Sequence, residues 1–111
     1  MFKQGDIVWF QFGPGKGHEQ RGFRPGLIIS NDTFNMVTRL YEVCSISTNT
    51  KNFPTHIMLD ESTKTKGAVF VEHSHVYDLS AREATFVEKC PDHILNKVIN
   101  LKRSFYKKPR S

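Results

Sequence analysis

Hydrophobic residues occur in short runs over most of the chain and at helical spacing only near its end. Runs rich in β-branched and aromatic side chains predict strands, because these side chains suit a pleated, half-buried surface. The predicted strands are residues 7–12 (IVWFQF), 26–30, 40–47, 55–59, 68–71, 75–79 and 85–88. The strands at 68–71 and 75–79 can also be read as one bent strand with a bulge at His73 and Ser74. Asn31 and Asp32 predict the cap of a short helical turn that ends at Asn35.

The last part of the chain has the pattern of an amphipathic helix. Pro91 stands where helices favour a proline, in the first turn. Ile94, Val98, Leu101 and Phe105 recur at spacings of four, three and four residues, which places them on one apolar face. Closely spaced strands followed by one helix predict a mainly β fold with a C-terminal helix. We expect a small antiparallel barrel or a strongly bent sheet with the helix packed on it.

Length and composition are typical of a single globular domain. The 111 residues are 38% hydrophobic and 24% charged, which is ordinary for a globular protein with one core. We expect one domain over residues 1–111, with a flexible basic tail at 107–111. No apolar stretch has the length of a membrane span, and we expect no signal peptide before the first strand. Cys44 and Cys90 lie far apart without a CxxC motif, so we expect a cytoplasmic protein with buried thiols and no membrane partner.

The charge of the chain supports nucleic-acid binding only weakly. The net charge is +5, with 16 Lys and Arg against 11 Asp and Glu. Five of those cations lie between Lys102 and Arg110, at the end of the predicted helix. Cations suit a helix C-terminus and also increase solubility. Any case for an RNA substrate must therefore come from the loops.

The loop after the first predicted strand carries the densest group of polar side chains. Residues 13–17 (GPGKG) end the strand, and the loop extends to Arg24. Pro25 restricts Arg24 to extended backbone geometry, and the loop glycines allow Glu19 to fold back toward it. Such a pair is either a structural ion pair or a phosphate clamp beside a proton acceptor. Composition alone favours the ion pair.

Four longer sequence motifs make the interpretation of this loop and of the whole chain more specific. They are GDIVW at 5–9, GHEQRGFRP at 17–25, SIST at 45–48 and PTH at 54–56. These strings resemble the MazF/PemK family of toxin ribonucleases, whose patterns read roughly G-D-[IV]-[WY], G-S-E-Q-x-G-x-R-P, P-[IC]-T-[ST] and P-T-H-V-E. Residues 67–78 resemble the family segment that usually contains [DE]-Q-[IV]-[RK]-x-[IV]-D. The likeness covers about residues 5–105, and the E-Q-x-G-x-R-P string is its most specific part.

The resemblance implies an SH3-like small barrel of the CcdB-like toxin fold and a homodimer. It implies cleavage of single-stranded mRNA at short sequences without a metal or a cofactor. It also implies a cognate antitoxin that lays a disordered acidic C-terminal segment across the RNA groove. The family's catalytic arginine falls on Arg24, its catalytic threonine on Ser47 and its motif glutamate on Glu19. We expect 2′,3′-cyclic phosphate and 5′-hydroxyl ends, because the 2′-hydroxyl is the nucleophile in metal-free RNA cleavage.

The chemistry of these side chains suggests a division of roles. The planar guanidinium of Arg24 matches the oxygens of an anionic phosphorane, and its high pKa makes it a poor base. Glu19 is therefore the preferred base, with His18 and Arg24 left open. Ser47 is expected to donate a hydrogen bond to a phosphate oxygen, or Thr48 if the register differs by one. The residues expected to bind RNA are His18, Gln20, Phe23, Thr48, Asn49, Lys51, Phe53 and His73.

Departures from the family pattern bear on positioning and specificity. Ser47 lacks the methyl group that restricts a threonine rotamer, so we expect looser positioning. His18, His73 and His75 replace other residues and are expected to alter sequence preference or pH optimum. His73 and His75 would share one face of a strand, but without a third ligand we expect no metal site.

Other residues have plainer explanations. Trp9, Phe10 and Phe12 are expected in the core, because aromatic residues of strands are usually buried. Phe23 and Phe53 are then the better candidates for stacking on bases. Cys44 lacks an evident His or Asn partner and is expected to be an inert buried thiol. 

Two other functions remain open on the sequence. A toxin of the same fold can poison DNA gyrase without cutting RNA, but it would not need Glu19, Arg24 and Ser47. An inactive relative that only binds nucleic acid or antitoxin would explain the departures at Ser47 and His73.

Overall fold

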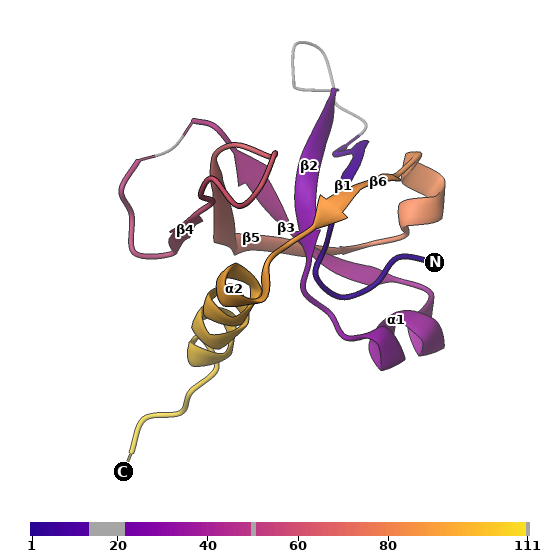
Figure 1. Cartoon of the computed structure of the whole chain (residues 1–111). Helices are drawn as coiled ribbons and strands as arrows, with labels where there is room; N and C mark the ends of the chain where they lie inside the picture. Colours follow the sequence, from indigo (N-terminus) through magenta and orange to yellow (C-terminus); the bar gives the residue numbers. More distant parts are fainter. Residues whose placement is uncertain (14–21, 50, 111) are drawn as a thin grey trace.

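Strands outnumber helices in the computed structural model, which describes residues 1–13, 22–49 and 51–110 (Figure 1). Its elements are β1 (Asp6–Gln11), β2 (Phe23–Ile28), α1 (Asp32–Thr38), β3 (Tyr41–Ser47), β4 (His56–Met58), β5 (Ala68–Tyr77), the 3₁₀ helix η1 (Leu79–Arg82), β6 (Thr85–Lys89) and α2 (Asp92–Ser104). No helix in these ranges is long and apolar enough to cross a membrane.

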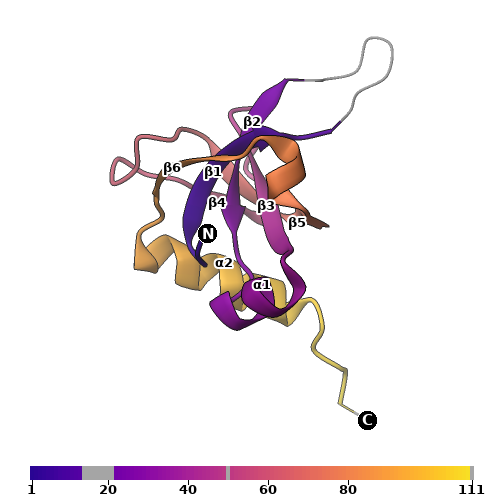
Figure 2. The same cartoon turned by 90° about the vertical axis from the view of Figure 1, so that its right-hand side faces the viewer.

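All six strands belong to one antiparallel sheet in the order β4-β5-β3-β2-β1-β6. The sheet bends strongly, and α2 lies across one of its faces (Figures 1 and 2). In the part of the chain that the structure describes, β4 and β6 are edge strands that do not pair with each other. The predicted mainly β fold with a C-terminal helix is confirmed, in the form of a bent sheet.

Strand β5 is bulged where it pairs with the middle of β3. Cys44 pairs with Ser74, whereas the next residue of β3, Ser45, pairs with Phe70. Residues 71–73 therefore have no partners of their own in β3, and they increase the local twist of the strand. The interpretation of 68–79 as one bent strand is confirmed up to Tyr77. Leu79 was predicted in this strand but begins η1, because the Asp78 carboxylate accepts a hydrogen bond from the Ser80 N–H and caps a helical turn.

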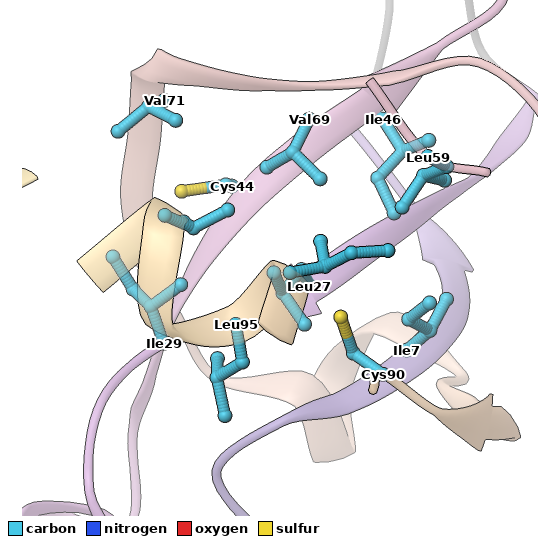
Figure 3. Packing of buried hydrophobic residues seen from close by; sticks show 12 residues of the cluster. Ile7, Leu27, Ile29, Cys44, Ile46, Leu59, Val69, Val71, Cys90 and Leu95 are labelled. Atoms are coloured by element: carbon cyan, nitrogen blue, oxygen red, sulfur yellow. The ribbon is translucent and has the colours of Figure 1, made fainter. Parts of the chain in front are cut away.

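The two faces of the sheet carry separate apolar clusters. The cluster beneath α2 contains Ile7, Leu27, Ile29, Cys44, Ile46, Leu59, Val69, Val71, Cys90, Ile94, Leu95 and Val98 (Figure 3). The cluster on the other face contains Val8, Phe10, Ile28, Tyr41, Val43 and Leu79. Side chains alternate between the faces along β1, and this alternation explains why a single hydrophobic run such as 7–12 serves both clusters.

The prediction for the aromatic residues of β1 is right for Phe10 and wrong for Trp9. Phe10 is fully buried, and Phe12 packs at the edge of its cluster. Trp9 is 45% exposed and lies outside the cluster that α2 covers. Its indole stacks on Phe23, with ring centroids 6.4 Å apart.

Both helices differ from the prediction at their ends. Asn31 caps α1 as predicted, but the helix continues to Thr38. Pro91 is the N-cap of α2 and not a residue of its first turn. Ile94 and Val98 are buried as predicted, whereas Phe105 lies beyond the last helical residue and is 40% exposed.

Both cysteines are free and buried, as predicted. Burial raises the pKa of Cys44 to about 12 and that of Cys90 to about 11. A thiol that stays protonated at neutral pH is a poor nucleophile. Neither residue is therefore a candidate for nucleophilic catalysis.

Candidate functional site

The strand register brings Arg24 and Ser47 together. The β2–β3 ladder ends with Gly26 opposite Ser45, so Arg24 and Ser47 each lie two residues beyond this last pair and line the same cleft. The structure corrects the prediction that the loop extends to Arg24, because β2 already begins at Phe23. The extended backbone that Pro25 imposes on Arg24 is the geometry of a strand, so the residue joins β2 and pairs with Phe10 of β1.

An open cleft of about 350 Å³ lies at this end of the strands. It is lined by Arg24, Pro25, Ile46, Ser47, Thr48, Asn49 and Lys66. The Ser47 hydroxyl oxygen accepts a hydrogen bond from the Asn49 N–H at 3.0 Å. This contact leaves the hydroxyl proton free to be donated into the cleft.

Arg24 rests on an aromatic platform held by a second arginine. The Arg24 guanidinium lies 5.2 Å from the centre of the Phe12 ring. Arg82 donates hydrogen bonds to the carbonyl oxygens of Gln11 at 3.2 Å and Phe12 at 2.9 Å, and its guanidinium lies 4.7 Å from the Tyr77 ring. These contacts tie the end of β1 to η1 and so restrain the ring on which Arg24 lies.

The turn before β5 brings Lys66 to the cleft and Lys64 to the cavity beside it. Glu88 accepts hydrogen bonds from the backbone N–H of Lys64 at 3.1 Å and from the N–H and hydroxyl of Thr65, both at 2.7 Å. Partial burial raises the pKa of Glu88, but these hydrogen bonds outweigh it and hold the pKa below its ordinary value. The ionised carboxylate thus anchors the turn that carries Lys64 and Lys66.

We expect Glu88→Gln to lower the free energy of unfolding at pH 7 by about 1–2 kcal/mol, because an amide accepts fewer hydrogen bonds than a carboxylate. The folded-state pKa of Glu88 is lowered, so its contribution is present at neutral pH and lost as the pH falls through that value. The difference between variant and parent should shrink below the ordinary pKa of 4.5. Urea unfolding at pH 7 and at acid pH measures it, with exposed Glu61→Gln as control. Equal differences at both pH values would contradict this role.

Two further cavities extend the cleft into a groove. One, of about 370 Å³, is lined by Trp9, Pro25, Thr48, Lys64, Thr65, Lys66 and Val87. The other, of about 330 Å³, is lined by Asn49, Lys51, Phe53, His56, Phe70 and Glu72. The first shares Pro25, Thr48 and Lys66 with the cleft, and the second shares Asn49. We call the three together the groove.

The predicted RNA-binding residues that the structure describes lie in or beside this groove. Thr48 and Asn49 line the cleft, and Lys51 and Phe53 line the cavity beside it. The His73 ring lies 5.9 Å from the Phe70 ring, and Phe23 lies against Trp9. His18, Glu19 and Gln20 lie outside the described residues, so the predicted approach of Glu19 to Arg24 stays a prediction.

The sequence interpretation missed several groove residues. Trp9 was assigned to the core, and Lys66, His56 and Glu72 were not singled out. The signal for Lys66 was its place in the charged turn 61–67, directly before Gly67 and a strand. Across the described ranges, no three His, Cys, Asp or Glu side chains gather as ligands for a metal ion.

Comparisons with known proteins agree with the fold and the motifs. Residues 3–104 match the family model described as PemK-like, MazF-like toxin of type II toxin–antitoxin system. Endoribonuclease PemK of Escherichia coli is 34% identical over 103 residues, covering 87% of this chain and 76% of that protein. A chain of the MazE–MazF (Form-II) crystal structure from Deinococcus radiodurans is 31% identical with a TM-score of 0.83, covering 93% of both chains.

A more distant structure shares the fold alone. The endoribonuclease in complex with its cognate antitoxin from Mycobacterial species has a TM-score of 0.81 at 17% identity. The superposition covers 98% of this chain and 100% of that one. The six-stranded sheet with its terminal helix is thus a known fold throughout.

Proposed function

The chain belongs to the PemK-like, MazF-like toxins of type II toxin–antitoxin systems, and on that premise we propose that it is a sequence-specific endoribonuclease. Its substrate is single-stranded mRNA in the cytoplasm, and the reaction needs no metal ion. The observation that carries the proposal is the cleft in which Arg24 and Ser47 lie together with Lys66. A guanidinium, a hydroxyl and an ammonium are donors suited to the oxygens of a phosphodiester.

The reaction is an internal transesterification. The 2′-oxygen attacks the adjacent phosphorus, the P–O5′ bond breaks, and the products are a 2′,3′-cyclic phosphate and a 5′-hydroxyl. Arg24 stabilises the negative charge of the phosphorane, and Ser47 donates a hydrogen bond to a non-bridging oxygen. A base takes the 2′ proton, with Glu19 preferred and His18 or Arg24 as alternatives, and the leaving 5′-oxygen gains a proton. Thr48 lines the same cleft and is the alternative hydroxyl.

The groove suits RNA beyond the scissile phosphate. Lys51, Lys64 and Lys66 offer cations along it, and Trp9 and Phe53 offer exposed aromatic rings. Single-stranded RNA is bound by this combination of charge and stacking. A cognate antitoxin with a disordered acidic segment would be attracted by the same cations and block the groove. The active form in this proposal is a homodimer.

Product analysis in the presence of EDTA tests the proposal. Purified protein, free of antitoxin, is incubated with a long single-stranded RNA, and the cut sites and end groups are mapped. We expect cuts at one short repeated sequence, with cyclic-phosphate and 5′-hydroxyl ends. Absence of cleavage on several RNAs would overturn the proposal and favour an inactive relative, or a gyrase poison if induced cells instead accumulate DNA breaks.

Two substitutions at Ser47 test separately how its hydroxyl group and its rotamer freedom affect the cleavage rate. We expect Ser47→Ala to lower the cleavage rate by roughly 10- to 100-fold, because one donor to the developing charge is lost. Ser47→Thr keeps the donor and restricts its rotamer, so the rate should equal or exceed that of the parent. Single-turnover cleavage of one short RNA measures both. If Ser47→Ala stays fully active while Thr48→Val does not, Thr48 supplies the hydroxyl.

A further inference from the structure

The excess positive charge of the protein lies at the end of α2 and in the segment that follows it. All 11 Asp and Glu residues occur within residues 1–92, together with 10 of the 16 Lys and Arg. Residues 93–108 contain five Lys and Arg and no carboxylate side chain. The end of α2 and the C-terminus lie on the opposite side of the molecule from the start of β2, which carries Arg24 (Figures 1 and 2). This charge is therefore separate from the groove.

Lys102 is bound to the sheet and holds two aromatic rings at the end of α2. Its Nζ donates a hydrogen bond to the Ser74 hydroxyl oxygen at 2.6 Å and lies 3.5 Å from Glu42 Oε2. The same ammonium lies 5.7 Å from the centre of the Phe105 ring and 5.6 Å from that of the Tyr106 ring. Cation–π contacts of this kind hold the rings beside the last turn of the helix.

The backbone after α2 is hydrogen-bonded up to Lys107. The N–H groups of Phe105, Tyr106 and Lys107 donate to the carbonyl oxygens three residues earlier, at 3.1, 3.1 and 3.3 Å. These bonds satisfy carbonyl groups that the end of a helix otherwise leaves without a partner. The side chains of these residues therefore have defined positions next to the helix and form a surface with it.

Three cations and one ring on this surface are available to a ligand. Arg103, Lys107 and Lys108 are exposed and form no ion pair with a carboxylate of the described residues. Tyr106 is 69% exposed. The helix dipole and solubility account for cations at this place, but an exposed aromatic ring works against solubility. Cations combined with an exposed ring are typical of surfaces that bind single-stranded nucleic acid.

Building on the proposed function, we propose that Arg103, Tyr106, Lys107 and Lys108 form a second binding site for single-stranded RNA, which we call the C-terminal site. The cations contact backbone phosphates, and the face of the Tyr106 ring turned away from Lys102 stacks on an unpaired base. Phosphates are the same in every nucleotide and stacking tolerates every base, so this site does not select a sequence.

A second site far from the groove favours long transcripts. RNA held in the groove keeps its flanking stretches at a high local concentration around the same molecule, so the second contact forms with little further loss of entropy. The molecule extends 45 Å along its longest axis. Only an RNA much longer than the stretch held in the groove therefore reaches both sites. We expect a long RNA to bind more tightly than a short fragment with the same cleavage sequence.

The salt dependence of binding tests the cations. The probe is a long fluorescein-labelled 2′-O-methyl RNA, which lacks the attacking hydroxyl and stays intact, and binding is followed by fluorescence anisotropy. Each phosphate contact of a single strand contributes about 0.7 to the slope of log K against log salt concentration. Lys107→Gln/Lys108→Gln should therefore reduce the magnitude of this slope by about 1.4 and weaken binding roughly ten-fold near physiological salt. Lys3→Gln/Lys97→Gln removes the same charge from exposed positions outside both sites and should keep the parent slope.

Substitutions of Tyr106 test the stacking separately. Tyr106→Leu should weaken binding roughly five-fold at every salt concentration and leave the slope unchanged, because stacking on a base releases no counterions. Tyr106→Phe keeps the ring and should keep the parent affinity. Thermal unfolding of each variant checks that the end of α2 stays folded.

Unchanged affinity and slope in Lys107→Gln/Lys108→Gln would overturn the proposal. Binding to phosphatidylglycerol vesicles that this variant loses, with its RNA affinity intact, would also overturn it and assign the site to an anionic lipid surface. Because the probe cannot be cut, these results do not depend on catalysis. Failure to cleave RNA would contradict the proposed function, whereas the change in slope reports on the C-terminal site alone.

Discussion

Arg24→Ala is expected to lower the rate of RNA cleavage by roughly 10²- to 10³-fold, the usual effect of removing one group that stabilises transition-state charge. Arg24 is half-buried in the cleft, its guanidinium lies 5.2 Å from the centre of the Phe12 ring, and it is not a member of either apolar cluster. Its removal therefore opens no cavity in either apolar cluster. We expect the variant to unfold within a few degrees of the parent.

Single-turnover cleavage in EDTA, with end-group mapping, measures the effect. Arg24→Lys should recover only part of the rate, because an ammonium keeps the charge but lacks the two-pronged donor geometry of a guanidinium. Arg110→Ala removes a cation from the exposed C-terminal tail and serves as the matched control. A folded Arg24→Ala protein that cuts at the parent rate would show that the chemistry lies elsewhere in the groove.

Gly67→Ala is expected to lower the free energy of unfolding by about 3 kcal/mol or more, which combines backbone strain and a steric clash. Gly67 has φ +112°, a conformation that residues with a Cβ rarely adopt. A Cβ at this position would lie 2.2 Å from the Ser47 carbonyl oxygen and 2.7 Å from its carbon. Both contacted atoms are backbone, so relief requires β3 and the start of β5 to move apart.

Thermal unfolding measures this effect, and a loss of this size corresponds to a fall in Tm of roughly 10 °C or more for a domain of this length. Because Ser47 pairs with Ala68, the displacement also reaches the cleft, and the cleavage rate should fall with the stability. Gly13→Ala is the control, since no atom of the described residues lies within 4 Å of a Cβ built there. Equal melting temperatures for parent and Gly67→Ala would show that the strands separate at little cost.

Strand and helix patterns in the sequence predicted most of the fold. Alternating and helical spacings depend on local geometry, so they located the strands and α2 to within a few residues. The interpretation failed where burial depends on distant elements. Trp9 and Ile7 lie two residues apart on the same face of β1, but only Ile7 belongs to the cluster beneath α2, whereas Trp9 is exposed. No local pattern shows how far a helix reaches across a sheet.

For the candidate site, the sequence by itself determined the family and the identity of two central side chains. The string around Arg24 and the segment holding Ser47 carry that information in their order of residues. Only the tertiary structure decided which side chains share a surface with them. Lys66, His56 and Glu72 come to the groove through the β3–β5 register, the bulge of β5 and the anchoring of a turn by Glu88. Such contacts join residues far apart in the chain, and their geometry depends on the register of a whole sheet, which a local pattern does not encode.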